Sequence, residues 1–185
     1  MNRRTVIKSA LTAAATGFAG CTGILRSVPA LAVVVPTSPA PNSPIFTQTL
    51  YIAKSASVVW QAITDKDIVT KYYMCPLADI DPSPGGQIRY GSGKKTYIKG
   101  VVMKASPNKT LEHTFQMSNH PEDVLTTVTY EISDMGDICK LTLTHSGFTF
   151  ENGTYQDISF GWPWILSRLK TLLETGHVMK MPDNM

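Results

Sequence analysis

The stretch that decides the fold is Gly161-Trp162-Pro163-Trp164-Ile165-Leu166-Ser167-Arg168-Leu169-Lys170-Thr171-Leu172-Leu173-Glu174-Thr175-Gly176. Its apolar residues recur every three or four positions, at 162, 165, 166, 169, 172 and 173. This spacing places them along one side of an α-helix. A helix with one apolar side must cover another surface, and the short alternating segments upstream predict an antiparallel sheet for that role.

Alternation of apolar and polar residues predicts six strands. They are expected at residues 45–53, 87–92, 97–105, 110–117, 124–133 and 138–146. Two short helices should follow the first strand, with Ser55 and Asp65 as their capping residues. The order predicts an α+β helix-grip fold, in which a long C-terminal α-helix lies across a curved antiparallel sheet. A pocket can form between these two layers, which favours binding of a small apolar molecule.

The N-terminus has the composition of an export signal. Residues 1–32 hold four basic residues and no acidic residue, together with many small apolar ones. The sequence Arg3-Arg4-Thr5-Val6-Ile7-Lys8 resembles a twin-arginine signal. We therefore expect the protein to be exported to the periplasm, or to the outer face of a bacterial membrane.

Two ways of processing this signal are open. Ala30-Leu31-Ala32 has the small-x-small form that signal peptidase cleaves. Phe18-Ala19-Gly20-Cys21 resembles a lipobox, which makes Cys21 a candidate for lipidation, although Phe18 stands where leucine is usual. An uncut anchoring helix is the third interpretation, and Arg26 disfavours it. We expect contact with a membrane only through the signal or a lipidated Cys21.

The rest of the chain divides into three parts. Residues 33–44 hold four prolines among serines and threonines, which predicts an extended linker. The folded domain is expected at 45–177, followed by a loose tail at 178–185. Without residues 1–32 the chain has 13 basic and 14 acidic residues, about −1 net charge. Its lysines cluster only at Lys94-Lys95, Lys99 and Lys104, as in a solvated hairpin, so we expect no nucleic-acid partner.

Four segments resemble the START-like or SRPBCC superfamily, in the branch related to the ATPase-activating domain of the heat-shock-protein-90 co-chaperone. They are Ser55–Asp65, Gly85–Tyr90, Leu141–Phe148 and Gly161–Gly176. The resemblance implies a cavity between the long helix and the sheet, which different members use for lipids, sterols, polyketides or other apolar ligands. Where relatives often have a tryptophan pair followed by Gly-Pro, this chain has Tyr72-Tyr73-Met74-Cys75-Pro76, so a more polar mouth is expected.

Two histidines should point into the interior. Strand alternation puts His113 on the same face as Phe115, and His145 on the same face as Leu143. Pairing through the turns places the two histidines two strands and two residues apart, about 12 Å, too far to share a metal ion. A core histidine hydrogen-bonded to a neighbour is the favoured interpretation for each. The competing hypothesis is that His145 acts on a ligand together with Tyr130 or Tyr90.

The residues expected to contact the ligand are the inward histidines and the large apolar residues. They are Trp60, Tyr73, Tyr90, His113, Phe115, Tyr130, His145, Trp162 and Leu166. His120 and His177 are expected in solvent. We expect no metal and no cofactor, because the sequence has no CxxC or Cys/His spacing and no phosphate-loop pattern. Neither GxSxG nor HExxH occurs, so hydrolase and metalloprotease functions have no support. Cys75 and Cys139 could pair in an oxidising compartment or remain free core residues.

Three functions are consistent with these patterns. The first is an exported protein that binds or carries a small apolar ligand. The second is a cyclase-like or isomerase-like enzyme acting on an apolar or polyketide-like substrate, with His145 and Tyr130 as weak catalytic candidates. The third is a protein-interaction module resembling the co-chaperone domain, which a solidly filled cavity would favour. Co-chaperone activity itself is not transferred, because a shared fold does not fix function.

Overall fold

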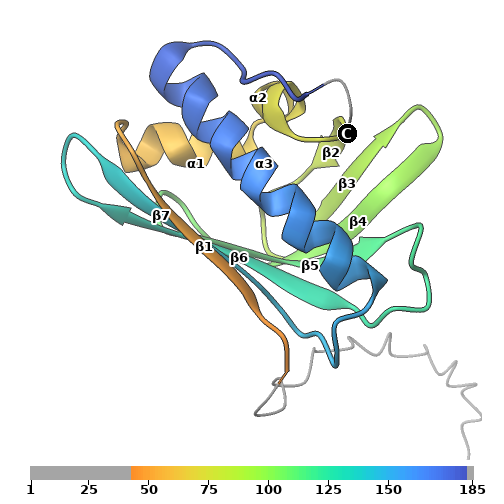
Figure 1. Cartoon of the computed structure of the whole chain (residues 1–185). Coiled ribbons are helices and arrows are strands. Elements are labelled where there is room, and N and C mark those ends of the chain that lie inside the picture. The colour runs from red at the N-terminus through yellow and green to blue at the C-terminus, as the bar shows by residue number, and fades with distance from the viewer. Residues whose placement is uncertain (1–42, 183–185) are drawn as a thin grey trace, which may run out of the picture. The chain divides into compact units, whose positions relative to one another are not determined.

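The computed structural model describes residues 43–182 and has the predicted α+β helix-grip fold (Figure 1). The strands are β1 (Phe46–Ile52), β2 (Leu77–Ile80), β3 (Gln87–Ser92), β4 (Lys95–Ser106), β5 (Thr110–Met117), β6 (Thr126–Asp134) and β7 (Cys139–Ser146). The helices are α1 (Ala56–Thr64), α2 (Lys66–Tyr72) and α3 (Gly153–Thr175). Within this part of the chain no helix is both long and apolar enough to cross a membrane. The expected export signal and Cys21 lie outside the described residues.

The seven strands form one antiparallel sheet in the order β1-β7-β6-β5-β4-β3-β2. Residues alternate between a buried and an exposed face, most clearly in β1 and β7. Register shifts between Tyr90 and Gly91, and between Val102 and Lys104, interrupt the β3–β4 and β4–β5 ladders. Such irregularities bend strands. In Figure 1 the β3–β4 hairpin rises beside α3, and the helix crosses the concave face of the sheet.

Helix α3 carries the predicted apolar stripe. Trp162, Ile165, Leu166 and Leu169 are buried, and Leu172 and Leu173 pack against the core. The helix begins at Gly153, eight residues before Gly161. Asn152 caps this earlier start by accepting a hydrogen bond from the Tyr155 amide. Pro163 therefore lies inside the helix, on its exposed side. The C-terminal signal is as expected, since Gly176 adopts the left-handed conformation with φ 78°.

The short helices also follow the sequence. Asp65 caps α2 by accepting hydrogen bonds from the amides of Asp67 and Ile68. Ser55 occupies the capping position of α1 but makes no capping hydrogen bond to the helix backbone. One strand was missed: β2, which the turn from Asp81 to Gly86 joins to β3. Its four residues are too few to give an alternating pattern above the background of a loop.

The predicted register of the last two strands was wrong by two residues. His145 lies opposite Val128, and Val128 lies opposite His113. Both histidines are therefore on one row across the sheet, about two strand spacings or ~10 Å apart. The β6–β7 turn has the expected four residues but lies one residue further along the chain, because the last pair is Asp134 with Cys139. Past Gly176 the chain has no helix or strand through Pro182, and the Met181 sulfur contacts the Arg168 guanidinium at 3.3 Å.

Candidate functional site: a cavity beside helix α3

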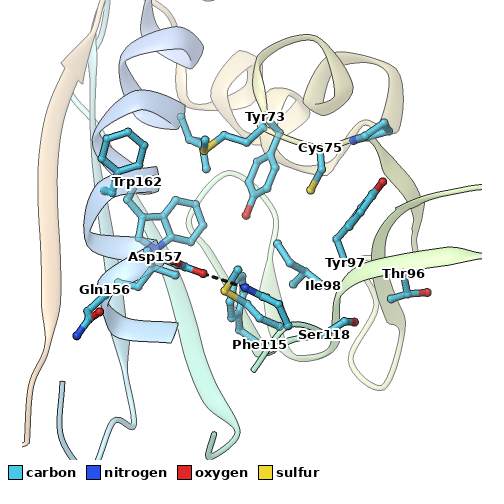
Figure 2. A pocket seen from close by; sticks show the side chains of 18 of the residues that line it. Tyr73, Cys75, Thr96, Tyr97, Ile98, Phe115, Ser118, Gln156, Asp157 and Trp162 are labelled. Atoms are coloured by element: carbon cyan, nitrogen blue, oxygen red, sulfur yellow. Dashed lines mark hydrogen bonds between the residues drawn. The ribbon is translucent and has the colours of Figure 1, made fainter. Parts of the chain in front are cut away.

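A cavity of about 840 Å³ opens between the N-terminal half of α3, strands β4 and β5, and the α2–β2 loop (Figure 2). Its apolar wall consists of Tyr73, Ile98, Phe115, Met117, Ile158, Trp162 and Ile165. Polar side chains also line it, namely Lys95, Thr96, Ser118, Asn119, Gln156 and Asp157. This size and this mixture of apolar and polar groups are typical of small-molecule sites.

Aromatic rings form a large part of the apolar wall. Tyr73 meets Trp162 edge to face, with ring centroids 6.0 Å apart, and Phe115 lies 6.4 Å from the same indole. Tyr73 also stacks on Tyr90 at 4.3 Å. Figure 2 shows the Tyr73 and Trp162 side chains pointing toward the space between α3 and the sheet. A ligand in the cavity would therefore contact rigid aromatic surfaces.

A chain of hydrogen bonds holds the Trp162 indole from behind. Its Nε1 donates to His145 Nδ1 at 3.1 Å, and His145 Nε2 lies 2.8 Å from the Thr126 hydroxyl. That hydroxyl donates to the Phe115 carbonyl at 3.0 Å. Because an indole N–H only donates and a carbonyl only accepts, the position of every proton in this series of hydrogen bonds is fixed. His145 must be neutral, with its proton on Nε2.

Both nitrogens of His145 are thus occupied, and the ring is fully buried. Burial is the main cause that lowers its pKa, to about 3, and the nearby His113 adds to the shift. A second proton would have to enter between Nδ1 and the indole N–H that already points at it. His145 therefore orients the cavity wall, as expected for a core histidine bonded to a hydroxyl, and presents no free nitrogen to a ligand.

His113 and Tyr130 form a layer behind the indole. Their rings lie 6.2 Å apart, and Tyr130 meets Trp162 edge to face at 6.3 Å. His113 Nδ1 donates to the Thr114 carbonyl at 2.8 Å. Burial lowers the pKa of His113 to about 4 and raises that of Tyr130 well above its ordinary value. At neutral pH both groups are uncharged.

Three of the nine residues predicted to bind a ligand line the cavity: Tyr73, Phe115 and Trp162. Five others are buried in the core but are not part of the lining. These are Tyr90, His113, Tyr130, His145 and Leu166. Trp60 is half-buried on α1 and does not line the cavity either. The alternation of the strands correctly put His113 and His145 inside but could not tell the cavity wall from the layer behind it.

A polar cluster at the edge of the cavity was not predicted. His120 Nε2 lies 3.0 Å from Asp157 Oδ2, and Asn119 donates to the same oxygen at 3.1 Å. His120 was expected in solvent and is partly covered, with 24% of its side chain exposed. It packs against Gly153, where an added Cβ would come within 2.4 Å of the imidazole. His120 and Asp157 are 37 residues apart in a loop and a helix, so no sequence spacing connects them.

The two cysteines in the described part of the chain are free thiols and form no disulfide. Cys75 lines the cavity, and burial raises its pKa to about 11, so the thiol is protonated at neutral pH. Cys139 is buried at the start of β7. Among residues 43–182, no group of three or more potential ligands is arranged to hold a metal ion.

Comparisons with solved structures show the same fold in other proteins. The Aha1 dimer from Colwellia psychrerythraea is 23% identical, with a TM-score of 0.60 over 72% of this chain and 98% of that one. The Hsp90 activator PFC0360w from Plasmodium falciparum is 22% identical, with a TM-score of 0.61 over 70% and 95%. CalU16 from Micromonospora echinospora is 17% identical, with a TM-score of 0.60 over 72% and 78%.

A comparison with curated protein sequences finds no match. The family model described as "Activator of Hsp90 ATPase homolog 1-like protein" matches residues 53–174, which lie within the domain expected at 45–177. This match covers well over half of the chain and includes the α3 stripe and the strands that form the cavity. The chain therefore belongs to the family of activator of Hsp90 ATPase homolog 1-like proteins.

Proposed function

We propose that this protein binds a small apolar ligand in the cavity between α3 and the sheet, and carries or stores it outside the cytoplasm. The observation that supports this most is the open cavity of about 840 Å³ with its aromatic and aliphatic wall. A domain that used this region only for packing would fill it with side chains. A solidly filled interior would favour the third candidate, a protein-interaction module, so the open cavity gives that candidate no support.

The mouth of the cavity suits a ligand that also has a polar group. Met74 and Phe160 are 44% and 52% exposed at its rim. Lys95 lies there too, with its ammonium 4.9 Å from the centre of the Tyr97 ring. An apolar body could occupy the space against Trp162, while a polar end remains near Lys95 and Asn119.

Binding can be followed through the Trp162 indole, because a ligand against it changes its emission. The chain has two other tryptophans, so the experiment uses a variant with Trp60→Phe and Trp164→Phe. We expect saturable changes on titration with apolar probes such as 1-anilinonaphthalene-8-sulfonate and long-chain fatty acids. Adding Gly161→Leu, which places a side chain into the lining, should weaken binding at least tenfold. Equal responses from both proteins would contradict the proposed site.

A cyclase-like or isomerase-like activity is the second candidate, and one observation favours it. Asp157 lines the cavity and is paired with His120, so an acid–base pair stands at its edge. His145 and Tyr130 are less suited to this role because both are held behind the wall. If the bound molecule is chemically converted, Asp157→Asn should abolish conversion while leaving binding within about threefold. Unchanged turnover in this variant would rule out the pair.

Export is proposed from residues 1–32 alone. Fusing these residues to a reporter protein should direct it out of the cytoplasm by the twin-arginine route, and Arg3→Lys with Arg4→Lys should retain it. Mass spectrometry of the mature protein then distinguishes the two processing routes. Cleavage after Ala32 gives a free Val33 amine, whereas lipidation leaves an acylated Cys21 at the new N-terminus. A reporter that stays in the cytoplasm would contradict the export proposal.

A further inference from the structure

Strand β1 is an edge of the sheet whose own sequence gives little protection against pairing, although side chains of α3 cover its end at Tyr51 and Ala53. It stands first in the strand order, so only its β7 side has a strand partner within residues 43–182. Its sequence, Phe46-Thr-Gln-Thr-Leu-Tyr-Ile52, has no charge and no proline. Natural edge strands usually carry lysine or proline, or are very short. The opposite edge, β2, follows this rule with only four residues next to Pro76.

The hydrogen bonds around β1 show which backbone groups face outward. The Tyr51 carbonyl accepts from Lys170 Nζ at 2.7 Å, and the Ala53 amide donates to Glu174 at 2.8 Å. Both α3 side chains must reach the outer side, because β7 occupies the other. In an antiparallel strand, every second residue directs its N–H and C=O to the same side. The backbone groups of Thr47 and Thr49 therefore face outward too, and have no partner among the described residues.

We propose that two copies of this chain pair through β1, antiparallel and centred on Gln48. This register places Thr47 opposite Thr49 of the second copy, and Ile45 opposite its Tyr51. The outward backbone groups of Thr47 and Thr49 then become mutual hydrogen-bond partners in both halves of the pairing. The two seven-stranded sheets continue into one another across a two-fold axis, as in other symmetric dimers.

Two exposed apolar side chains favour this register. Ile45 is 50% exposed and Tyr51 is 53% exposed, and they lie three residues on either side of Gln48. In the proposed pairing each covers the other across the new strand boundary. Pairs of aromatic with β-branched side chains, and of threonine with threonine, stabilise neighbouring strands. A shift of the centre by one residue in either direction leaves Tyr51 without this partner.

Gln48 itself provides a further observation at the axis. Its Oε1 is buried and has no hydrogen-bond partner within the described part of the chain. Leaving a buried acceptor unpaired is costly. In the proposed pairing Gln48 lies directly opposite Gln48 of the second copy, in a pair whose Cα atoms are about 4.5 Å apart. The side-chain amide of each copy can then donate to the Oε1 of the other.

The first test is sedimentation of the full chain between 1 µM and 1 mM, with two substitutions at one position. Thr47→Pro removes an outward N–H without removing a hydrogen bond to β7, and should make the protein monomeric over the whole range. Thr47→Val keeps that N–H and should still dimerise. Circular dichroism confirms that both variants are folded. A wild-type protein that is monomeric at 1 mM, or a dimer that persists in Thr47→Pro, would overturn the proposal.

The second test reads the register through disulfide formation, in a chain with Cys21→Ser and Cys75→Ser. Gln48→Cys should cross-link under mild oxidation, because its Cα atoms lie within disulfide range. Thr47→Cys and Thr49→Cys should not, since each lies about 8 Å from its own copy across the axis. Efficient cross-linking of Thr47→Cys or Thr49→Cys instead of Gln48→Cys would contradict the centring on Gln48.

Discussion

The two halves of α3 cover the sheet in different ways. In the C-terminal half, Leu166 and Leu169 are each 1% exposed, and the helix contacts α2 and β1. From the N-terminus to the middle of the helix, Gly161, Trp162 and Ile165 line an open cavity. The apolar stripe is continuous along the helix, so the difference comes from what lies opposite. The two short helices complete the core at the closed end, whereas the bent β3–β4 hairpin stands away from the open end (Figure 1).

Acidification should affect the open end first and most strongly. His113 and His145 lie behind its wall, and their pKa values are lowered to about 4 and about 3. The unfolded chain binds protons at these residues from about pH 6.5 downward, so stability falls as the pH falls toward the folded-state values. We expect a loss of about 2 kcal/mol per histidine between pH 6.5 and 5.

Urea unfolding at several pH values measures this loss, and hydrogen exchange locates it. The pKa values of Asp81, Asp123 and Glu174 are also lowered, but these carboxylates affect the stability mainly below about pH 4.5, outside the range from pH 6.5 to 5. At pH 5, amides in β5 and β7 should exchange faster, with less change in α1. A stability that is constant from pH 6.5 to 5 would contradict the neutral buried histidines.

Truncating one apolar residue of α3 that lines the cavity and one that does not tests the comparison directly. Leu169→Ala leaves a hole in the closed end and should lower the free energy of unfolding by about 3 kcal/mol. Ile165→Ala removes atoms that already face open space, so about half that loss is expected. Denaturant unfolding of both variants gives the values. Equal losses would mean that the cavity end is packed as tightly as the rest.

Removing the indole N–H tests the hydrogen-bond chain at the open end. Trp162→Phe leaves His145 Nδ1 buried without a donor and should cost about 2 kcal/mol. Trp164→Phe is the matched control, because Trp164 is only half-buried and its indole makes no hydrogen bond to any of residues 43–182. Its effect should stay within about 0.5 kcal/mol. Similar losses for both variants would show that the hydrogen bond to His145 does not hold Trp162 in place.

The smallest effect is expected at the rim. His120→Gln should change the free energy of unfolding by less than about 1 kcal/mol, because contacts between partly exposed polar side chains contribute little. His120 and Asp157 are 24% and 46% exposed. Thermal unfolding of the variant is the measurement. A loss of several kcal/mol would show that the loop holding His120 is part of the closed core rather than of the cavity mouth.

The elements that could be predicted from the sequence are those that depend on the spacing of apolar residues or on local capping. Helix α3 and most strands followed from the spacing of apolar residues, and Asp65 from its capping chemistry. The strand β2 was too short to carry a pattern, and the β6–β7 register depended on the exact position of the turn, which alternation does not fix. Alternation also placed His145 inside, but it could not show that the Trp162 indole donates a hydrogen bond to the Nδ1 of this histidine. The His120–Asp157 pair depends on how a loop meets a helix end, which no local pattern records.

The measurement that tests the central claim most directly is native mass spectrometry of the protein purified from the organism that makes it, with Gly161→Leu produced in parallel. Gly161 lines the cavity, and a Cβ there would touch only the flexible Met74 side chain, at 3.4 Å. The variant should fold, and leucine should favour the helix over glycine by up to about 1 kcal/mol. We predict that the wild-type protein carries a discrete apolar molecule, released by organic solvent, and that the variant is empty. A wild-type protein without any bound molecule that also takes up none of the apolar probes would contradict the proposed function.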